Sequence, residues 1–490
     1  MNQGHSAQPV VETRSFDHVP ESERSGTLST QLRFWFMLNA TLLTAFTGAV
    51  GPAAGLGLPM TLLAIVTGTI FGTLFQAFHG AQGPHMGLPQ MIQSRVQFGS
   101  RGAIIPIGAA TVVYLGFSLF YIQSGSSALT AATGLDRVIP VSTVLLGAVA
   151  VLLAIFGIRW ILRAEGIIAW VMLANLVVLT VAAFATLPVG ALLSDWTGTF
   201  LGFLVQFGAA ALYQLAIAPQ VSDYTRYLPS KTSSLAVSAT VFVGTASAAV
   251  WLESLGAVIT LSHPDLDVIT GIQRTGDELY SGIGTITMVI AVIVGVVTAA
   301  VTFYSASVSF LSILEAFRKL WSTFRLRAWT ISMSGLLVIA LALTLPADTV
   351  GAFGVFLALL GYLLIPWTAV NLVDYYLVRR GMYSIADIMR QDGGIYGRWG
   401  MRGMVAYVVG FITMVPFFST ALYTGPLATL LGGADLSFAV GLIVSSLLYI
   451  GLMRRVNLAA ERKIVATSPL HTPLRETSTR PLSAGDGLRG

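Results

Sequence analysis

The sequence predicts an all-α, polytopic membrane protein with twelve transmembrane helices. Of the 490 residues, 55% are hydrophobic and only 10% are charged, whereas a soluble domain carries about 25% charged residues. The mean hydropathy is +0.78. Twelve apolar stretches have about the length that a bilayer requires. The basic residues lie almost entirely in every second connection between them, which places these residues on one side of the membrane. Composition therefore excludes a soluble enzyme, a nucleic-acid-binding protein and a disordered chain.

The predicted spans are separated by short connections and flanked by two polar tails. Residues 1–32 have no apolar core followed by a cleavage site, so we expect a cytoplasmic tail rather than a signal peptide. Residues 456–490 are polar and towards the end rich in Pro, Ser, Thr and Arg, which predicts a disordered cytoplasmic tail. The spans are expected at residues 34–58, 60–80, 103–128, 141–158, 166–188, 200–222, 235–261, 281–312, 328–345, 350–377, 403–424 and 435–453.

The charges give the orientation of the chain. With both termini inside, all of the 27 Lys and Arg residues except Arg137 and Arg274 fall in inner segments. The outer loops are acidic instead. One span more or fewer would destroy this alternation, so the positive-inside rule supports a multi-pass protein of the plasma (inner) membrane with both termini cytoplasmic. The net charge of +5 then needs no nucleic-acid partner. The acidic residues of the outer loops are Asp136, Asp195, Asp265, Asp267, Asp277, Glu278, Asp348 and Asp435.

One carboxylate, Glu253, is predicted well inside a span. An acid at membrane depth is costly and is often functional, for example as a proton carrier. The alternative is an acid near the outer end of a long helix that reaches water or a partner.

Glycine and proline interrupt the first and sixth spans. The first contains residues 44–48 and then Gly51 and Pro52, and the sixth contains Gly208 and then Pro219. Proline removes a backbone donor, and freed backbone groups persist at membrane depth only where they line protein or a cavity. Interruptions five spans apart indicate a transporter built of two inverted five-helix repeats. The alternative is that Gly and Pro are frequent in transmembrane helices generally.

This repeat interpretation divides the chain into parts. The first repeat is expected at 33–190 and the second at 191–380, followed by an inner loop and two further helices at 381–455. In the third span, Tyr114, Phe117 and Tyr121 lie on one helical face. Such a face can stack on a flat ligand, although an aromatic stripe also serves packing or lipid contact.

Three local motifs carry a family resemblance. They are residues 83–91 (GPHMGLPQM) with the following Ser94, Arg95, Phe98, Gly99, Gly102 and Pro106, residues 222–229 (SDYTRYLP), and residues 374–383 (DYYLVRRGMY). In order and spacing these motifs resemble the nucleobase:cation symporter-1 family, in particular its purine–cytosine permease branch, and the resemblance covers about residues 30–455.

The resemblance implies a LeuT-like fold of ten helices in two inverted repeats with two additional C-terminal helices. It implies a symporter that imports a neutral planar nucleobase or related heterocycle of the cytosine, purine, hydantoin or allantoin type, by alternating access. Uptake would be coupled to an H+ or Na+ gradient, with no other cofactor. We expect the protein to function as a monomer in the lipid bilayer.

The resemblance also places substrate contacts on individual residues of this chain. The ring-stacking aromatic falls on Phe117, a polar contact on Tyr114, and an amide position on Tyr121, which departs from the family pattern. A second aromatic position falls on Gln214, next to Tyr213. Further contacts are expected from Thr302 and, closing the site, from Phe46 and Thr47.

The ion site is less well matched. Where sodium-coupled members carry adjacent hydroxyl residues, this chain has Val296 and Val297, followed by Thr298. A sodium site is therefore uncertain at the sequence level, and Glu253 is the alternative candidate for ion coupling, by protons. The motif residues Arg95, Asp223, Arg226 and Asp374 are expected at inner helix ends, as an inner gate or as loop-anchoring ion pairs.

Other functions remain as alternatives. An amino-acid or amine transporter of the same fold would need a charged anchor in the site, and none of the central positions is charged. A channel or a non-transporting receptor is a further alternative, but no continuous polar pore lining is evident. A membrane enzyme is not supported, because the six histidines form no metal-ligand spacing or nucleophile–base pair.

Overall fold

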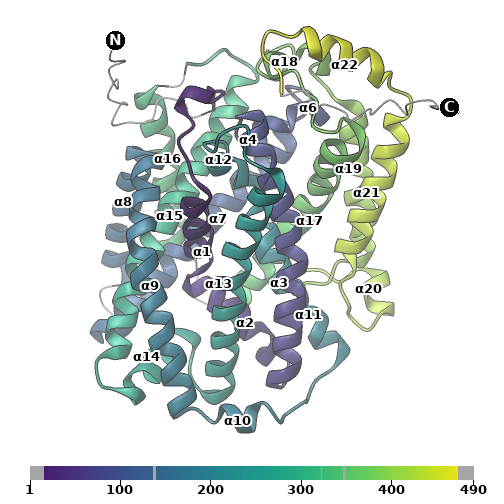
Figure 1. The fold of residues 1–490 in the computed structure, drawn as a ribbon. Helices are drawn as coiled ribbons and strands as arrows, with labels where there is room; N and C mark the ends of the chain where they lie inside the picture. The colour runs from purple at the N-terminus through teal and green to yellow at the C-terminus, as the bar shows by residue number, and fades with distance from the viewer. Residues whose placement is uncertain (1–15, 136–138, 322, 346–348, 473–490) are drawn as a thin grey trace, which may run out of the picture.

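The computed structural model describes residues 16–135, 139–321, 323–345 and 349–472, with backbone only at 158–165 and 349–350. Arg14, Asp136, Arg137, Asp348 and the basic residues beyond 472 thus lie outside the described residues. The described chain is a bundle of helices with no named strand. Both described termini lie at one end of the bundle, called the termini end, and α10 (Val189–Leu192), α14 (Val268–Leu279) and α20 (Pro426–Leu430) lie at the opposite end (Figure 1).

Each of the twelve predicted spans is matched by helix in the described chain. Nine helical segments are long and apolar enough to cross a membrane, and two bent helix pairs raise the number to eleven. The shorter apolar segment Met401–Phe417 accounts for the remaining predicted span. The helices of the spans are α1 (Leu28–Asn39) with α2 (Leu42–Ala53), α3 (Leu58–Gly80), α7 (Ile104–Thr133), α8 (Ile139–Phe156), α9 (Ile158–Thr186), α11 (Phe200–Leu215) with α12 (Val221–Thr225), α13 (Ser234–Ser262), α15 (Ile283–Glu315), α16 (Phe324–Thr344), α17 (Thr349–Val373), α19 (Met401–Met414) and α21 (Ser437–Met453).

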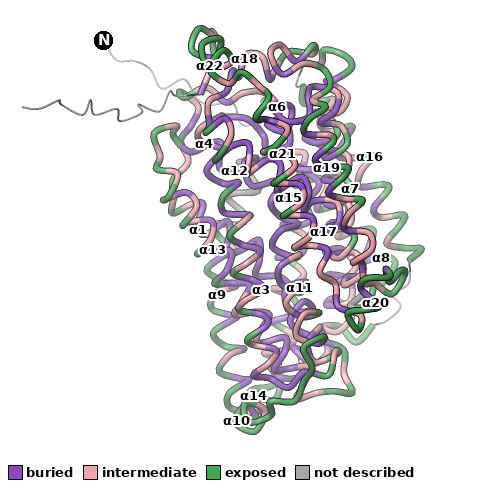
Figure 2. Tube along the Cα trace, turned by 90° about the vertical axis from the view of Figure 1, so that its right-hand side faces the viewer, coloured by how far each residue is buried: buried purple, intermediate pink, exposed green. Residues whose placement is uncertain are grey.

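The burial pattern is that of a membrane protein. Buried residues run along the interior of the bundle, and exposed residues gather at α10 and α14 at one end and at α22 (Leu458–Thr467) at the other (Figure 2). Large apolar side chains such as Trp170 and Phe184 of α9 are exposed along the sides. Such a surface is stable only against lipid, because no solvent other than hydrocarbon favours it. The short helices α4 (Gln82–Met86), α5 (Gln90–Gln93), α6 (Arg95–Phe98) and α18 (Ile385–Ile388) cover the termini end.

The first span is bent, but not at the predicted glycines. α1 and α2 meet at 52°, and the break falls at Ala40 and Thr41 rather than within residues 44–52. Side chains satisfy the backbone there: the Thr44 hydroxyl donates to the Asn39 carbonyl at 2.5 Å. Pro52 lies near the end of α2 without breaking it.

A side chain from the sixth span supports α2 near Pro52. The Gly51 N–H donates to Oε1 of Gln206 on α11 at 2.5 Å. The side-chain nitrogen of Gln206 in turn donates to the Thr47 carbonyl at 3.1 Å. Thr47 and Gly51 are four residues apart, the spacing of a backbone pair in a helix. The Gln206 amide binds both members of this pair and thereby ties α11 to α2 directly before Pro52.

The sixth span is interrupted beyond its middle. α11 continues through Gly208, contrary to the sequence expectation, and ends at Leu215. A 3-10 turn at Ala218–Gln220 follows and leads into α12. Pro219 occupies the start of this turn, where its missing N–H costs least. The predicted interruption at Pro219 is confirmed.

The C-terminal segment departs from the prediction of a disordered tail. Residues 458–467 form α22, whose first turn is capped by the Asn457 side chain accepting from Ala460 N–H at 3.0 Å. Beyond it, Thr472 is fully buried and pairs with Tyr383 through backbone and side chain. Packing against the termini end supplies the stability that the polar composition of the segment does not indicate.

Close helix contacts depend on glycine. A Cβ at Gly72 of α3 would overlap the backbone of Ala211 on α11, so only glycine allows the two helices to approach at this point.

Replacing Gly72 with leucine should destabilise the fold by about 1–3 kcal/mol, the usual cost of overpacking a tight contact. The measurement is thermal unfolding of the purified protein in detergent. Gly451→Leu on α21 is the matched control, because the space beside Gly451 is open. Equal melting temperatures of the two variants would contradict the contact.

Candidate functional site

Six aromatic rings form a cluster in the middle of the bundle. Phe117 of α7 lies at its centre, 5.9 Å from Tyr213 of α11 and stacked on Tyr121 at 6.1 Å between ring centroids. Two rings of α17 contact Phe117 edge to face, Phe353 at 6.2 Å and Phe356 at 5.5 Å. The aromatic cluster consists of Phe117, Phe120, Tyr121, Tyr213, Phe353 and Phe356. Three predicted residues, Phe117, Tyr121 and Tyr213, are thus brought together by helices of different repeats.

The cluster is tied to the bend of the first span. The Tyr213 hydroxyl lies 3.0 Å from the Thr44 hydroxyl and 3.4 Å from the Thr41 hydroxyl. Both threonines stand at the start of α2, directly after the break. A displacement of α2 would therefore move an aromatic residue of the cluster.

Gln214 stands next to Tyr213 in the last turn of α11, before the interruption of the sixth span. Its side chain is fully buried, yet neither the oxygen nor the nitrogen of its amide has a hydrogen-bond partner. Buried polar groups are nearly always paired, and an unpaired one requires an explanation. A ligand or water that bonds this amide would be such an explanation.

The other predicted contacts are bonded within the protein. The Thr302 hydroxyl on α15 lies 2.8 Å from that of Ser118 on α7. The Thr47 hydroxyl donates to the Leu43 carbonyl, and Phe46 is buried in the same turn of α2. The structure places Tyr114 closer to the termini end, where it interacts electrostatically with Asp223. Ring contacts of the described residues do not include Tyr114.

The two candidates for ion coupling differ in their bonding. The Thr298 hydroxyl is used by its own helix, donating to the Val294 carbonyl at 2.9 Å. Glu253 of α13 is fully buried and accepts one hydrogen bond, from the Thr69 hydroxyl of α3 at 3.3 Å. In the part of the chain that the structure describes, no group of three or more His, Asp or Glu side chains could hold a metal ion.

The predicted motif residues at the termini end are anchored in place. Arg95 of α6 pairs with Glu315 of α15 at 2.6 Å and donates to the Ser312 carbonyl. Asp223 of α12 accepts from the Gln90 N–H at 2.9 Å. The guanidinium of Arg226 donates to the Asp223 carbonyl at 3.2 Å. Arg226 also donates to the Tyr304 hydroxyl of α15 at 3.4 Å. All three motif residues are buried, and their bonds tie the segments of this end to one another and to α15.

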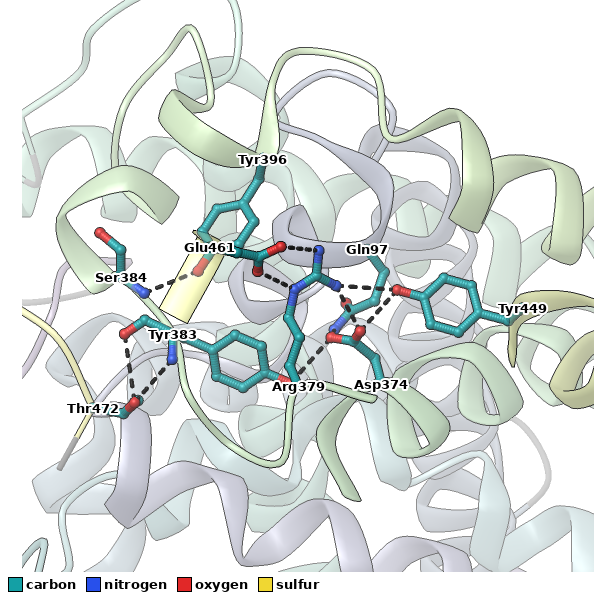
Figure 3. Close-up of polar contacts among 9 residues, drawn as sticks. All are labelled: Gln97, Asp374, Arg379, Tyr383, Ser384, Tyr396, Tyr449, Glu461 and Thr472. Carbon is teal, nitrogen blue, oxygen red and sulfur yellow. Dashed lines mark hydrogen bonds and ion pairs between the residues drawn. The ribbon is translucent and has the colours of Figure 1, made fainter. Parts of the chain in front are cut away.

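Asp374 is the centre of a larger network, which follows the end of α17 (Figure 3). One carboxylate oxygen accepts from Arg379 at 2.6 Å and from the Tyr449 hydroxyl at 2.8 Å. The other accepts from Gln97 at 2.9 Å and from the Tyr383 hydroxyl at 3.1 Å. The carboxylate therefore joins α6, α21 and the loop after α17.

Arg379 extends this network to the C-terminal helix. Its guanidinium also pairs with Glu461 of α22 at 2.5 Å. Burial by itself lowers the pKa of Arg379, but the charges of Asp374 and Glu461 outweigh it and hold this pKa well above its usual value. Burial, reinforced by Asp374, likewise raises the pKa of the Tyr383 phenol. The arginine thus remains charged and the phenol neutral, which keeps donors and acceptors matched.

Several of these residues were not found from the sequence. Phe353 and Phe356 belong to an apolar span in which nothing marks them as site residues, and Gln206 has no partner in its own helix. Arg379 belonged to a recognised motif, but its partner Glu461 lies 82 positions away in a segment predicted to be disordered. The only sequence signal was the presence of polar side chains within apolar or unstructured stretches.

The helical bundle, with one bent span, one span interrupted by a 3-10 turn and an uncharged aromatic cluster beside them, has the LeuT-like architecture of a membrane transporter. The chain belongs to the nucleobase:cation symporter-1 family: the model described as permease for cytosine/purines, uracil, thiamine and allantoin matches residues 18–441. This confirms the resemblance based on the three motifs, and it shows a permease rather than an enzyme.

Individual relatives agree with this assignment. YxlA of Bacillus subtilis, which carries the name of a purine-cytosine permease, is 37% identical over 451 residues, 91% of this chain and 96% of its own. The purine-cytosine permease FCY2 of Saccharomyces cerevisiae is 23% identical over 464 residues, 90% of this chain and 85% of its own. The solved structure of Mhp1, a nucleobase-cation-symport-1 family transporter in a closed conformation with bromovinylhydantoin bound, superposes with a TM-score of 0.75 at 18% identity. It covers 93% of this chain and 100% of the Mhp1 chain.

The network around Asp374 generates a stability prediction. Glu461→Gln removes one charge from a largely buried pair, and removing one partner of a buried pair typically costs about 3–5 kcal/mol. We expect α22 to detach, so that trypsin cleaves at Arg462 and Lys463 faster than in the unaltered protein. The matched control is Asp392→Asn, because its pair with Arg390 is exposed and exposed pairs contribute about 0–1 kcal/mol. Identical cleavage rates at these two sites in all three proteins would show that the pair does not hold α22.

Proposed function

We propose that this permease is a symporter that imports a neutral planar heterocycle by alternating access, and that its ring binds at the aromatic cluster. The observation that carries the proposal is Gln214, a fully buried amide without partners in the turn next to Tyr213. A planar heterocycle offers ring faces for Phe117 and Tyr213, and donors and acceptors on its edge for the amide. The residues of the cluster and Gln214 are uncharged, which favours a neutral ring over an amino acid or amine.

The individual roles follow from the positions of the residues. Phe117 stacks on the ring, and Tyr121 and Tyr213 extend the contact. Thr302 offers its hydroxyl, shared with Ser118, to the ring edge. Phe46 and Thr47 close the site from α2. A wrong ring would leave the buried amide unpaired, and this penalty gives selectivity.

The substrate class is suggested by the relatives. The family model is described for cytosine/purines, uracil, thiamine and allantoin, two relatives are named for purines and cytosine, and Mhp1 holds a hydantoin. A ring of the cytosine, purine, hydantoin or allantoin type is therefore proposed for this chain.

The route and orientation are proposed from a groove and from the charges. A groove of about 380 Å³ opens between α2, α11 and α17 and is lined by residues including Val50, Ala209 and Leu357. Leu357 lies one turn after Phe353 of the aromatic cluster. The basic residues concentrate at the termini end, so we assign that end to the cytoplasm of a plasma (inner) membrane. The groove would then admit substrate from outside, and the protein would act as a monomer.

Phe117→Ala should weaken binding of the transported ring by about 1–3 kcal/mol, the usual contribution of one stacked aromatic residue to base binding. This corresponds to about a 5- to 150-fold rise in Kd. Gln214→Ala should weaken binding by leaving the ring edge unpaired. The measurement is competition uptake in cells with equal amounts of protein in the membrane. Phe184→Ala is the control, since this ring is 69% exposed. Unaltered uptake in both site variants would overturn the site.

The substrate and the coupling ion are tested together in proteoliposomes. Labelled cytosine, hypoxanthine, hydantoin and allantoin are offered under an imposed sodium gradient, a proton gradient or neither. We expect concentrative uptake of at least one of these rings under one gradient. A failure of all four rings under every gradient would contradict the proposed function.

A further inference from the structure

A row of buried polar side chains runs along α3. Thr69, Thr73, Gln76 and His79 are all fully buried. Thr69 and Gln76 bond side chains of α13, whereas the His79 ring stacks on Trp367 of α17 at 4.6 Å. Thr69, Thr73 and Gln76 fall within about 60° of one another around the helix, which turns about 100° per residue. From Thr69 to His79 the helix rises about 15 Å, which is half of a hydrocarbon core about 30 Å thick. The row therefore leads from the middle of the membrane to the termini end.

The row is only partly bonded. The Gln76 amide donates to the Thr245 hydroxyl of α13 at 3.2 Å, and the His79 ring lies 3.3 Å from the Gln90 amide. The hydroxyl oxygen of Thr73 and the amide oxygen of Gln76 have no partner. Unpaired polar groups at membrane depth are costly, and ordered water is their usual partner in protein interiors. Thr73 and Gln76 thus each leave a hydrogen-bonding position for water beside α3.

Glu253 stands beside Thr69, at the mid-membrane end of this row. Oε2 of its carboxyl group accepts from Thr69, and Oε1 has no partner. None of the described basic side chains forms an ion pair with it. Of the helices packed against α13, α2 and the described part of α9 carry no titratable side chain. α3 carries His79, α1 carries Arg33, and α14 carries Asp277 and the ion pair of Arg274 with Glu278. Tyr213 of α11 interacts with Glu253 electrostatically. A carboxylate buried without a cation is so costly that the group takes up a proton instead.

The position of Glu253 couples its charge to the substrate site. Its backbone is packed directly against Gly48 of α2, where a Cβ would overlap it. The same helix begins with Thr44, which bonds Tyr213 of the aromatic cluster. A negative charge at Glu253 would thus act on both α2 of the bent span and Tyr213 of the aromatic cluster.

We propose that Glu253 is the proton-binding residue of the transport cycle, and that the row from Thr69 to His79 conducts its proton to the termini end. This proposal rests on the proposed function, because it names the proton as the ion whose gradient drives the proposed transport. In one state of the cycle the carboxylate takes up a proton from the solution at the opposite end of the bundle and forms its O–H bond. In the other its O–H bond breaks, the proton passes to the waters of the row, and solution at the termini end receives one proton for each carboxylate formed.

The first test follows protons during transport. Proteoliposomes that contain a pH-sensitive dye receive labelled cytosine outside, and the unaltered protein should acidify the interior as cytosine enters. Glu253→Gln should abolish the acidification and the concentrative uptake driven by a proton gradient. Thr73→Val and Gln76→Leu, which leave the carboxyl group in place, should slow the acidification. Thr67→Val is the matched control, because its hydroxyl bonds its own helix away from the row. Acidification at the unaltered rate in Glu253→Gln, or in both row variants, would overturn the proposal.

The second test needs no substrate. In the unaltered protein, infrared difference spectra between acid and alkaline buffer should show a carboxylic-acid band that disappears in alkali. Thr298→Ala should show the same band, and Glu253→Gln should lack it. If the band is present but cytosine and the other three rings are not transported, the proposed function fails and the proton site stands. If transport occurs but no such band depends on Glu253, the proton site fails and the proposed function stands.

Discussion

Inside a bilayer every backbone N–H and C=O needs a partner from the protein, and the structure depends on how this chain meets that demand at its bends. The amide of Gln206 on α11 bonds the Gly51 N–H and the Thr47 carbonyl of α2, directly before Pro52. At the bend itself, the Thr44 hydroxyl donates a hydrogen bond to the Asn39 carbonyl. These bonds supply partners for backbone groups at membrane depth, and they tie the bend to the aromatic cluster, since Thr44 also bonds Tyr213.

The chemistry of the bundle changes along its axis. The termini end is fixed by charge, where Asp374 and Arg379 bind loops and the helix α22 into one network. The middle is aromatic and uncharged apart from Glu253. This division has a physical reason, because water and short helices at the membrane surface can solvate ion pairs, whereas charge in the hydrocarbon is costly. A neutral ring can occupy such a centre, and a single proton-binding carboxyl group can control it.

Much of this organisation was predictable. Hydropathy and the positive-inside rule predicted twelve spans, and each is matched by helix, because the membrane imposes length and charge rules on each segment separately. The helical spacing of Phe117 and Tyr121 correctly placed both on one face, and Pro219 marked the interruption of the sixth span. The bend of the first span was predicted within residues 44–52 but falls at Ala40 and Thr41, since glycine and proline permit a bend in a helix without requiring one.

The sequence by itself determined that the chain crosses a membrane several times and to which permease family it belongs, because these properties are additive over local segments and motifs. Only the tertiary structure decided which residues meet. Phe353 joins Phe117, Glu461 joins Arg379, and Glu253 stands at the end of a polar row on another helix. Such contacts join helices far apart along the chain, and their geometry depends on how the helices pack, which leaves no periodicity in the sequence.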